Sequence, residues 1–189
     1  MITPLTKRVL ASKFALLGFD AGWSSLVARW ARNSAELKIM STKLKGDIAE
    51  QAAVLHALKR GWEVLKPIGD RSPYDLIFGV NENFIKVQVK SAWYDRKRLN
   101  YVVDNRRTKT NRRQMVRSKY EPSDFDFALV YLEDLDLFYI FPVDVFISYS
   151  SEIHLVEADK RQRKPQSAKY RDAWHLILQW AVCEETCIR

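Results

Sequence analysis

The chain has 189 residues, enough for one ordinary domain and a small appendage, and it carries a net charge of +8. Its 47% hydrophobic and 12% aromatic residues suffice for a packed core and exclude a disordered chain. With only two cysteines, Cys183 and Cys187, a disulfide framework and a zinc-finger array are excluded. No apolar run approaches the roughly 20 residues of a membrane-spanning helix. We expect a cytoplasmic protein with reduced thiols that does not associate with membranes.

The first 40 residues differ in composition from the rest of the chain. They are basic and nearly free of acids, and their apolar residues fit the two faces of a helical hairpin. An organelle transit peptide is an alternative, because such segments are also basic. Met40 could be the true first residue of the protein, since the first strongly patterned helix follows it directly. We therefore divide the chain into a helical extension, 1–40, and a domain, 41–189.

Helical and extended segments follow one another from residue 47. Residues 47–60 are helix formers throughout and end at Gly61, a frequent helix stop. Segments rich in aromatic and β-branched residues are predicted strands: 62–67, 74–80, 84–92, 126–132 and 137–141. Residues 142–147 predict a short helix that begins with proline, and residues 170–182 predict an amphipathic helix, with a strand as the alternative. This order indicates an α/β domain with a mixed sheet.

Positive charge is concentrated in residues 96–119. This segment holds ten basic side chains and a single acid, Asp104, so it accounts for the whole positive excess of the chain. A polyanion is the natural partner, because each neutralised phosphate releases condensed counterions and arginine forks pair with phosphate. We predict contact with nucleic acid; a solvated loop that only keeps the protein in solution is the alternative. The candidate residues are Arg96, Lys97, Arg98, Arg106, Arg107, Lys109, Arg112, Arg113, Arg117 and Lys119.

A predicted hairpin at residues 74–90 brings polar side chains together. A two-residue turn at 81–82 fixes a register in which the apolar side chains of both strands share one face. On the other face, Asp75 lies directly opposite Gln88, and Lys90 lies two residues further along. The same pattern that builds the core therefore predicts a cluster of Asp75, Gln88 and Lys90.

A carboxylate, an amide oxygen and an ammonium in one cluster suit a magnesium site. Mg²⁺ prefers hard oxygen ligands and retains waters and substrate phosphate oxygens. Asp75, Gln88 and the Val89 carbonyl would bind the ion, while Lys90 would orient a water or stabilise transition-state charge. Glu50 lies on an apolar side of its helix. We expect it to be the third side-chain ligand of the metal or a group that contacts the ligands. The alternatives are an ordinary surface pair of Asp75 with Lys90, and a helix-edge ion pair of Glu50 with a lysine.

Three segments in this order and spacing resemble the PD-(D/E)XK nuclease superfamily: Lys45–Glu50, Pro73–Asp75 and Gln88–Trp93. Over roughly residues 43–147 the chain is similar to group I intron-associated homing endonucleases on the restriction-endonuclease-like fold. The resemblance implies a metal-dependent, site-specific DNA endonuclease with a central mixed β-sheet flanked by helices. It implies that Asp75 binds the metal, that Lys90 is catalytic and that Glu50 is the helix-borne acid. Gln88 stands where most members have an acid, which removes one negative charge from the metal site.

The expected partners follow from this chemistry. Cutting both strands of double-stranded DNA requires two sites, so we expect a homo-oligomer, a dimer or a tetramer. A Holliday-junction resolvase or a restriction-type nuclease would share the same site and differ in substrate. A non-catalytic nucleic-acid-binding module on the same fold is the alternative of another class, and Gln88 is the residue that suggests it.

Overall fold

The computed structural model describes residues 42–69, 71–110, 115–157 and 165–187. The chain divides into two units, Met1–Ser41 and Thr42–Arg189. The helical extension predicted for residues 1–40 lies outside the described residues. In the part that is described, no helix has the length and apolar character needed to cross a membrane.

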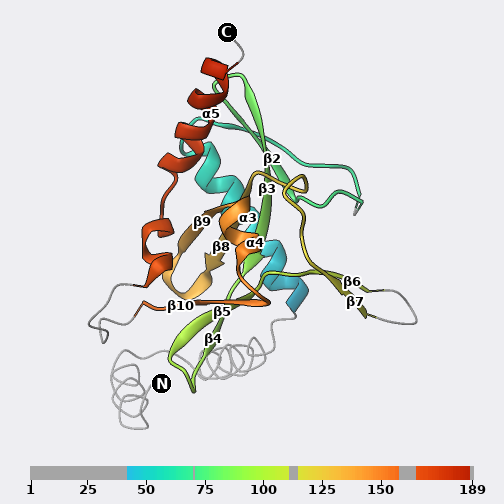
Figure 1. Cartoon of the computed structure of the whole chain (residues 1–189), viewed down its shortest axis with the longest axis vertical. Coiled ribbons are helices and arrows are strands. Elements are labelled where there is room, and N and C mark those ends of the chain that lie inside the picture. Colours follow the sequence, from blue (N-terminus) through green and yellow to red (C-terminus); the bar gives the residue numbers. More distant parts are fainter. Residues whose placement is uncertain (1–41, 70, 111–114, 158–164, 188–189) are drawn as a thin grey trace, which may run out of the picture. The chain divides into compact units, whose positions relative to one another are not determined.

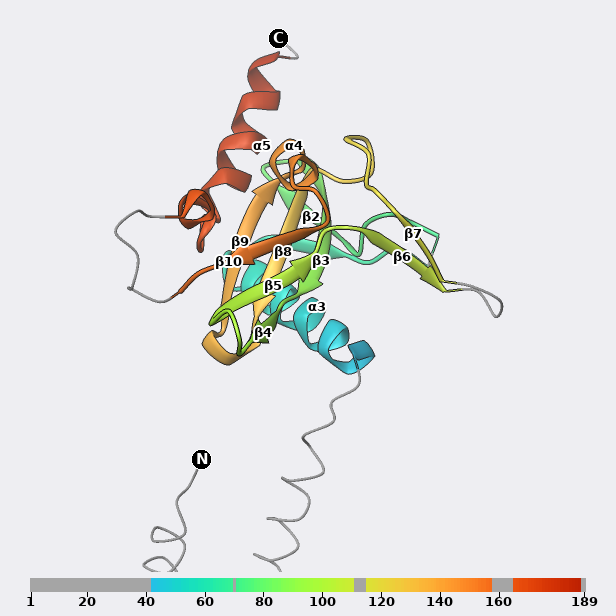
Figure 2. The same cartoon turned by 60° about the horizontal axis from the view of Figure 1, so that its bottom comes forward.

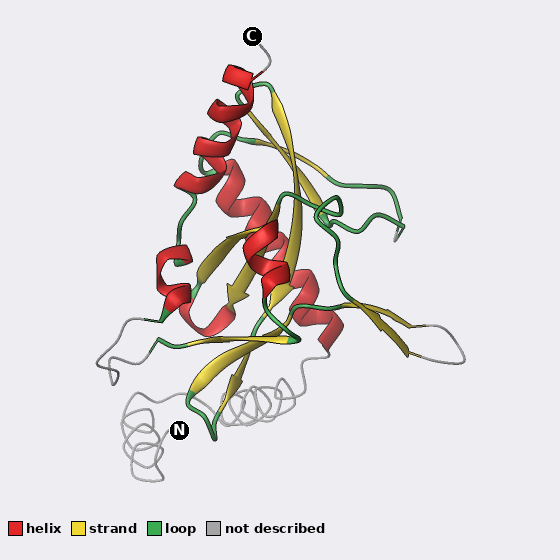
Figure 3. Ribbon diagram, in the orientation of Figure 1, coloured by secondary structure: helices red, strands yellow, loops and turns green. Residues whose placement is uncertain are grey.

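A five-stranded sheet forms the centre of the fold (Figures 1 and 3). The strand order is β1-β2-β3-β8-β9, in which β3 and β8 run parallel and the other neighbours are antiparallel. The strands are β1 (Glu63–Leu65), β2 (Leu76–Val80), β3 (Asn83–Ser91), β8 (Phe127–Leu132) and β9 (Leu137–Pro142). The predicted central mixed sheet is confirmed, and its strands are the five that the sequence predicts.

Helices cover both faces of this sheet. α3 (Thr42–Leu58) and α5 (His175–Cys187) share one hydrophobic core with the sheet, and α4 (Val143–Ser148) contributes to the core on the other face. α3 lies close to the strands because its buried residues are alanines spaced four apart: Ala49, Ala53 and Ala57. Two short 3-10 helices, η1 (Glu133–Leu135) and η2 (Gln166–Tyr170), complete the elements. The predicted α/β class, with a sheet flanked by helices, is confirmed.

Two helix boundaries differ from the sequence prediction. α3 begins at Thr42, several residues before the predicted start. The segment predicted at 170–182 as a helix or a strand is a helix, but it starts only at His175, after η2 and a short irregular stretch. Asp172 lies in that stretch with φ 46°, a left-handed conformation that interrupts any continuous helix from residue 170.

The connection between the parallel strands β3 and β8 carries β-structure. β4 and β5 pair with β10 in a three-stranded antiparallel sheet, while β6 and β7 form a hairpin that projects from the domain (Figures 1 and 2). The bounds are β4 (Trp93–Asp95), β5 (Asn100–Asp104), β6 (Arg107–Thr110), β7 (Met115–Ser118) and β10 (Glu152–Leu155). The sequence prediction contains none of these strands. The basic segment 96–119 is therefore built largely from strands and lies in the crossover between two core strands.

The β2–β3 hairpin has the register that the sequence predicts. Leu76 pairs with Val87, and the pairing continues to the turn without a bulge. The turn residues Asn81 and Glu82 have φ values of 47° and 65°. Positive φ at both positions is what a two-residue hairpin turn with the proper twist requires. The same register places Asp75, the residue directly before β2, opposite Gln88 of β3.

Candidate active site

Asp75 and Gln88 lie side by side at the edge of the hairpin. The Asp75 N–H donates to the Val87 carbonyl at 2.9 Å, so the β2–β3 pairing extends one residue before β2. The Gln88 Nε2 donates to Asp75 Oδ2 at 2.5 Å, and the Val89 N–H donates to the same oxygen at 2.8 Å. The structure thus brings together the two residues that the register places opposite each other.

Lys90 lies on the same face of β3 and is half-buried. Its Nζ donates to the main-chain carbonyl of Arg106 at 3.0 Å and lies 5.1 Å from the centre of the Tyr120 ring. Burial lowers the pKa of Lys90, and the charges of Asp75 and Asp104 partly oppose this effect. Because the ammonium is held inside the protein by a carbonyl and a ring, an ordinary surface ion pair does not describe this site.

Glu50 approaches the cluster from α3. Its charge raises the pKa of Asp75, which means that the two carboxylates lie within electrostatic reach of each other. Glu50 Oε2 also accepts a hydrogen bond from Lys66 Nζ at 2.5 Å. The lysine pairing that the sequence offered as an alternative is therefore present, in addition to the proximity to Asp75.

Sequence reasoning missed Lys66 and Tyr120. The antiparallel pairing of β1 with β2 puts Leu65 opposite Ile77, so the next residue, Lys66, comes close to Asp75. Lys66 was missed because no register was predicted for β1. For Tyr120 the sequence offers no comparable signal, because it follows a strand that the hydrophobic pattern does not predict.

The electrostatics of the site centre on Asp75. Burial raises the pKa of its carboxyl to about 6. The hydrogen bond from the Val89 N–H opposes this rise, the charge of Glu50 adds to it, and the charges of Lys90 and Lys66 reduce it. Two carboxylates thus share a partly desolvated site with two lysines. Perturbed carboxyl groups of this kind concentrate at functional sites.

The donor atoms of the site fit a hard divalent cation. The oxygens come from the Asp75 and Glu50 carboxylates and the Val89 carbonyl, and Gln88 Nε2 contacts both Asp75 and this carbonyl, the latter at 3.2 Å. If the amide turned over, Gln88 would present its oxygen there instead. Among the described residues no group of three or more His, Cys, Asp or Glu could hold a metal. One or two carboxylates are nevertheless what Mg²⁺ commonly uses together with waters and phosphates.

Several basic residues of the segment 96–119 are exposed. Arg96, Lys97 and Arg98 lie in the exposed turn between β4 and β5, where Arg98 Nε is 3.9 Å from Asp95 Oδ2. Lys119 is exposed directly after β7. The described side chains at these positions are therefore accessible to a phosphate backbone. Lys109 belongs to β6 and its side chain is not described, while Arg112 and Arg113 lie outside the described residues.

Two arginines at the root of the β6–β7 hairpin have internal partners. Arg106 forms a two-point pair with Asp104, through Nε to Oδ1 at 2.9 Å and Nη2 to Oδ2 at 3.0 Å. Arg107 Nη2 donates to the carbonyls of Arg71 and Ser72, each at 3.2 Å. Arg117 is exposed, with Nη1 3.9 Å from Asp104 Oδ2. The positive segment therefore includes residues that hold the hairpin in place as well as residues that face solvent.

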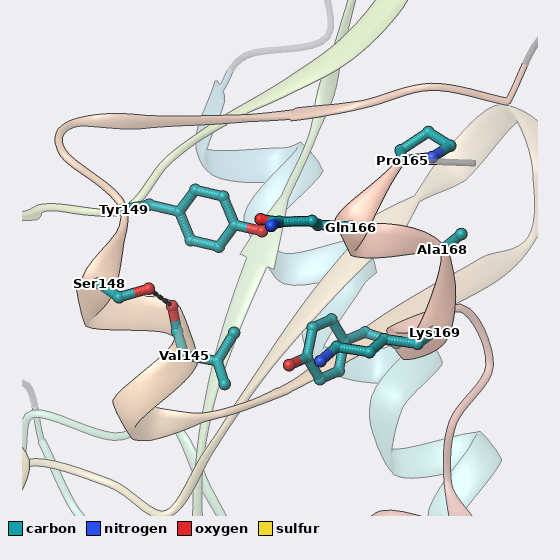
Figure 4. Close-up of a pocket in the computed structure, with 8 residues that line it drawn as sticks. Val145, Ser148, Tyr149, Pro165, Gln166, Ala168 and Lys169 are labelled. Atoms are coloured by element: carbon teal, nitrogen blue, oxygen red, sulfur yellow. Dashed lines mark hydrogen bonds between the residues drawn. The ribbon is translucent and has the colours of Figure 1, made fainter. Parts of the chain in front are cut away.

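An open pocket with a volume of about 760 Å³ lies between α4 and η2 (Figure 4). Tyr149 and Gln166 extend toward each other across it, and Ser148 Oγ donates to the Val145 carbonyl at its edge. None of the four predicted site residues lines this pocket. The polar cluster around Asp75 is therefore distinct from it.

Comparisons with known proteins identify the family of the chain. Residues 40–177 match the PD-(D/E)XK endonuclease family. A solved structure of a bacterial homing endonuclease, I-Ssp6803I, is 67% identical in sequence, with a TM-score of 0.73. The similarity covers 77% of this chain and 99% of that one. No match is found among the curated proteins. Since the family match spans well over half of the residues, the chain belongs to the PD-(D/E)XK endonucleases.

Proposed function

We propose that this endonuclease is a homing-type enzyme that cuts double-stranded DNA at specific sites and depends on Mg²⁺. The observation that carries the proposal is the convergence of Asp75, Glu50 and Lys90 on one half-buried cluster. This cluster lies at the root of a projecting basic hairpin, since Lys90 binds the carbonyl of Arg106. The proposed metal site and the proposed DNA-contacting hairpin are thus joined directly by this hydrogen bond.

Asp75, the Val89 carbonyl and the turned-over amide of Gln88 would hold the metal, with Glu50 as the additional carboxylate. When bound, Mg²⁺ supplies a Lewis acid that neutralises charge on the phosphate and favours ionisation of water. Glu50 would exchange its hydrogen bond from Lys66 for this role. The raised pKa of Asp75 supports the assignment, because a cation relieves the repulsion between two partly desolvated carboxylates.

Lys90 would act on the scissile phosphate. Its ammonium has a fixed position, between the Arg106 carbonyl and the Tyr120 ring, and lies near Asp75. From there it orients the attacking water or stabilises the negative charge that develops on the phosphate oxygens. A donor that is already in place loses little free energy to reorganisation during the reaction.

The DNA-binding surface consists of the exposed basic side chains of the segment 96–119. They would contact phosphates and set the register on the duplex, while some arginine or glutamine side chains of the same segment read base edges in the major groove. One active site per chain cuts one strand, so the protein would work as a homo-oligomer with two-fold symmetry. We place it in the cytoplasm, where the thiol of the exposed Cys183 would stay reduced.

The replacement Asp75→Asn is expected to stabilise the metal-free protein at pH 8. Because burial raises the pKa of Asp75 to about 6, the folded state holds its proton more tightly than the unfolded state. The charged carboxylate therefore lowers the free energy of unfolding above pH 6, and this penalty disappears as the pH falls toward 4. We expect a gain of about 2 kcal/mol at pH 8, by denaturant unfolding in EDTA, and almost none near pH 4.

Divalent metal provides the companion measurement. Mg²⁺ should raise the melting temperature of the wild-type protein and have little effect on Asp75→Asn, because a ligand that binds only the folded state stabilises it. Equal stabilisation of both proteins by Mg²⁺ would contradict the assignment of Asp75 as a ligand.

Cleavage of a plasmid that carries the target site should require both a divalent metal and Lys90. Lys90→Ala removes the ammonium at the phosphate and should reduce the cleavage rate by at least a hundredfold, with DNA affinity in EDTA nearly unchanged. Lys86→Ala, on the same face of β3, is the matched control and should cleave like the wild type. A fully active Lys90→Ala variant would refute the catalytic role. Faster cutting of branched than of linear DNA would favour a junction resolvase.

Lys119→Met should reduce the salt dependence of DNA binding. Lys119 is exposed beside the root of the hairpin, and each lost phosphate contact lowers the slope of log Kd against log salt by about 1. Fluorescence anisotropy at several salt concentrations measures this slope. Lys59→Met, an exposed lysine after α3, serves as the control with the same charge change and should leave the slope intact.

The oligomeric state can be measured by analytical ultracentrifugation together with the products of cleavage. We expect a dimer or a tetramer, and linear plasmid should appear early because paired sites cut both strands in one encounter. A monomer that accumulates nicked circles before any linear product would contradict the two-fold arrangement.

A further inference from the structure

Asp104 is the single acid within the basic segment 96–119, and the DNA-binding role of that segment does not explain it. It is the last residue of β5, directly before the β6–β7 hairpin, and its side chain is 25% exposed. A negative charge among ten basic side chains weakens the attraction for phosphate. Asp104 is therefore expected to have a role other than binding DNA.

The hydrogen bonds to Asp104 come from Arg106, and Arg117 Nη1 lies 3.9 Å from its Oδ2. Its Oδ1 accepts hydrogen bonds from the main-chain N–H and from the Nε of Arg106, both at 2.9 Å, and its Oδ2 accepts one from Arg106 Nη2 at 3.0 Å. A carboxylate that binds the backbone two residues ahead fixes a tight turn. Burial raises the pKa of Asp104, but the hydrogen bonds and charge of Arg106, together with the charge of Arg117, outweigh this effect and keep the pKa low. The turn is therefore held by an ionised carboxylate.

The carbonyl of the same residue binds the lysine of the active site. The Arg106 oxygen accepts from Lys90 Nζ at 3.0 Å, and the Tyr120 ring, at the other root of the hairpin, covers this ammonium. Asp104 thus fixes the N–H and the side chain of Arg106, while Lys90 uses the carbonyl. The charge of Asp104 also acts directly on Lys90 and favours its protonated form.

We propose that Asp104 is a positioning residue: by fixing the turn at Arg106, it holds the Lys90 ammonium in the place where cleavage requires it. This inference rests on the proposed catalytic role of Lys90. The root of the hairpin would then carry the exposed residues that contact DNA and would also orient the lysine that acts on the phosphate.

The test uses Asp104→Ala in two measurements: the cleavage rate should fall, and DNA affinity should not. In single-turnover cleavage with saturating enzyme and Mg²⁺, the rate constant should fall at least tenfold, because Lys90 loses its fixed acceptor. In EDTA, DNA should bind as tightly as to the wild type or more tightly, because a negative charge is removed from a basic surface. Asp104→Asn keeps an oxygen for the Arg106 N–H and should recover a large part of the rate.

Asp95→Ala is the matched control. Asp95 Oδ1 accepts from the N–H groups of Lys97 and Arg98, at 2.9 and 3.4 Å, so it holds a similar turn beside the same segment. The charge change is identical, but the contacts of Asp95 lead to the β4–β5 turn and not to Lys90. This variant should cleave at the wild-type rate.

The inference fails if Asp104→Ala cleaves at the wild-type rate, if Asp95→Ala loses as much, or if weaker DNA binding accounts for the whole loss. If the Asp104→Ala variant does not fold, Asp104→Asn is tested in its place. A cleavage rate below that of the wild type, with unchanged DNA affinity, then supports the proposal, and a wild-type rate contradicts it. Failure of the proposed function itself would show differently: the wild type would not cleave, or Lys90→Ala would cleave normally.

Discussion

The pairing of β2 with β3 is the constraint on which the site depends. Leu76 faces Val87 in the core between the sheet and α3, so alternation turns Asp75 and Gln88 to the opposite face, where the Gln88 amide reaches the Asp75 carboxylate. A slip of one residue would expose the apolar side chains and separate the polar ones. Since β3 also pairs with β8 in the middle of the sheet, Gln88 and Lys90 belong to a strand that is paired on both sides.

Gln88 has a physical consequence for the protein without metal. It is 8% exposed, and its amide donates to Asp75, whose pKa burial and the charge of Glu50 already raise. A glutamate at this position would place a third carboxylate in the same partly desolvated site and would have no N–H to donate. The amide therefore reduces charge repulsion in the metal-free site, and it would attract a metal at the proposed site more weakly than a glutamate would.

The sequence predicted the elements whose hydrophobic pattern is local: α3, the five core strands and the β2–β3 turn. It missed the second sheet because β5 pairs with β10, a strand that lies far away in the sequence. In this pairing Asp104 lies opposite Glu152, and no short-range pattern connects these two residues. Lys66 was missed for a similar reason, since its proximity to Asp75 depends on how β1 pairs with β2. The basic segment was predicted as one DNA-contacting group, yet only the contacts in space reveal that Arg106 and Arg107 bind inside the domain.

Two parallel neighbouring strands require a crossover connection, usually a helix. Here the crossover from β3 to β8 contains the basic hairpin, so the element proposed to contact DNA begins soon after the strand that carries Lys90. Its root is attached on two sides, through Lys90 to the Arg106 carbonyl and through Arg107 to the carbonyls of Arg71 and Ser72, shortly before Asp75. A displacement of the hairpin root by bound DNA would therefore act on Lys90 and on the segment before Asp75 together. The proposed recognition element and the proposed catalytic lysine are therefore coupled through the backbone at the hairpin root.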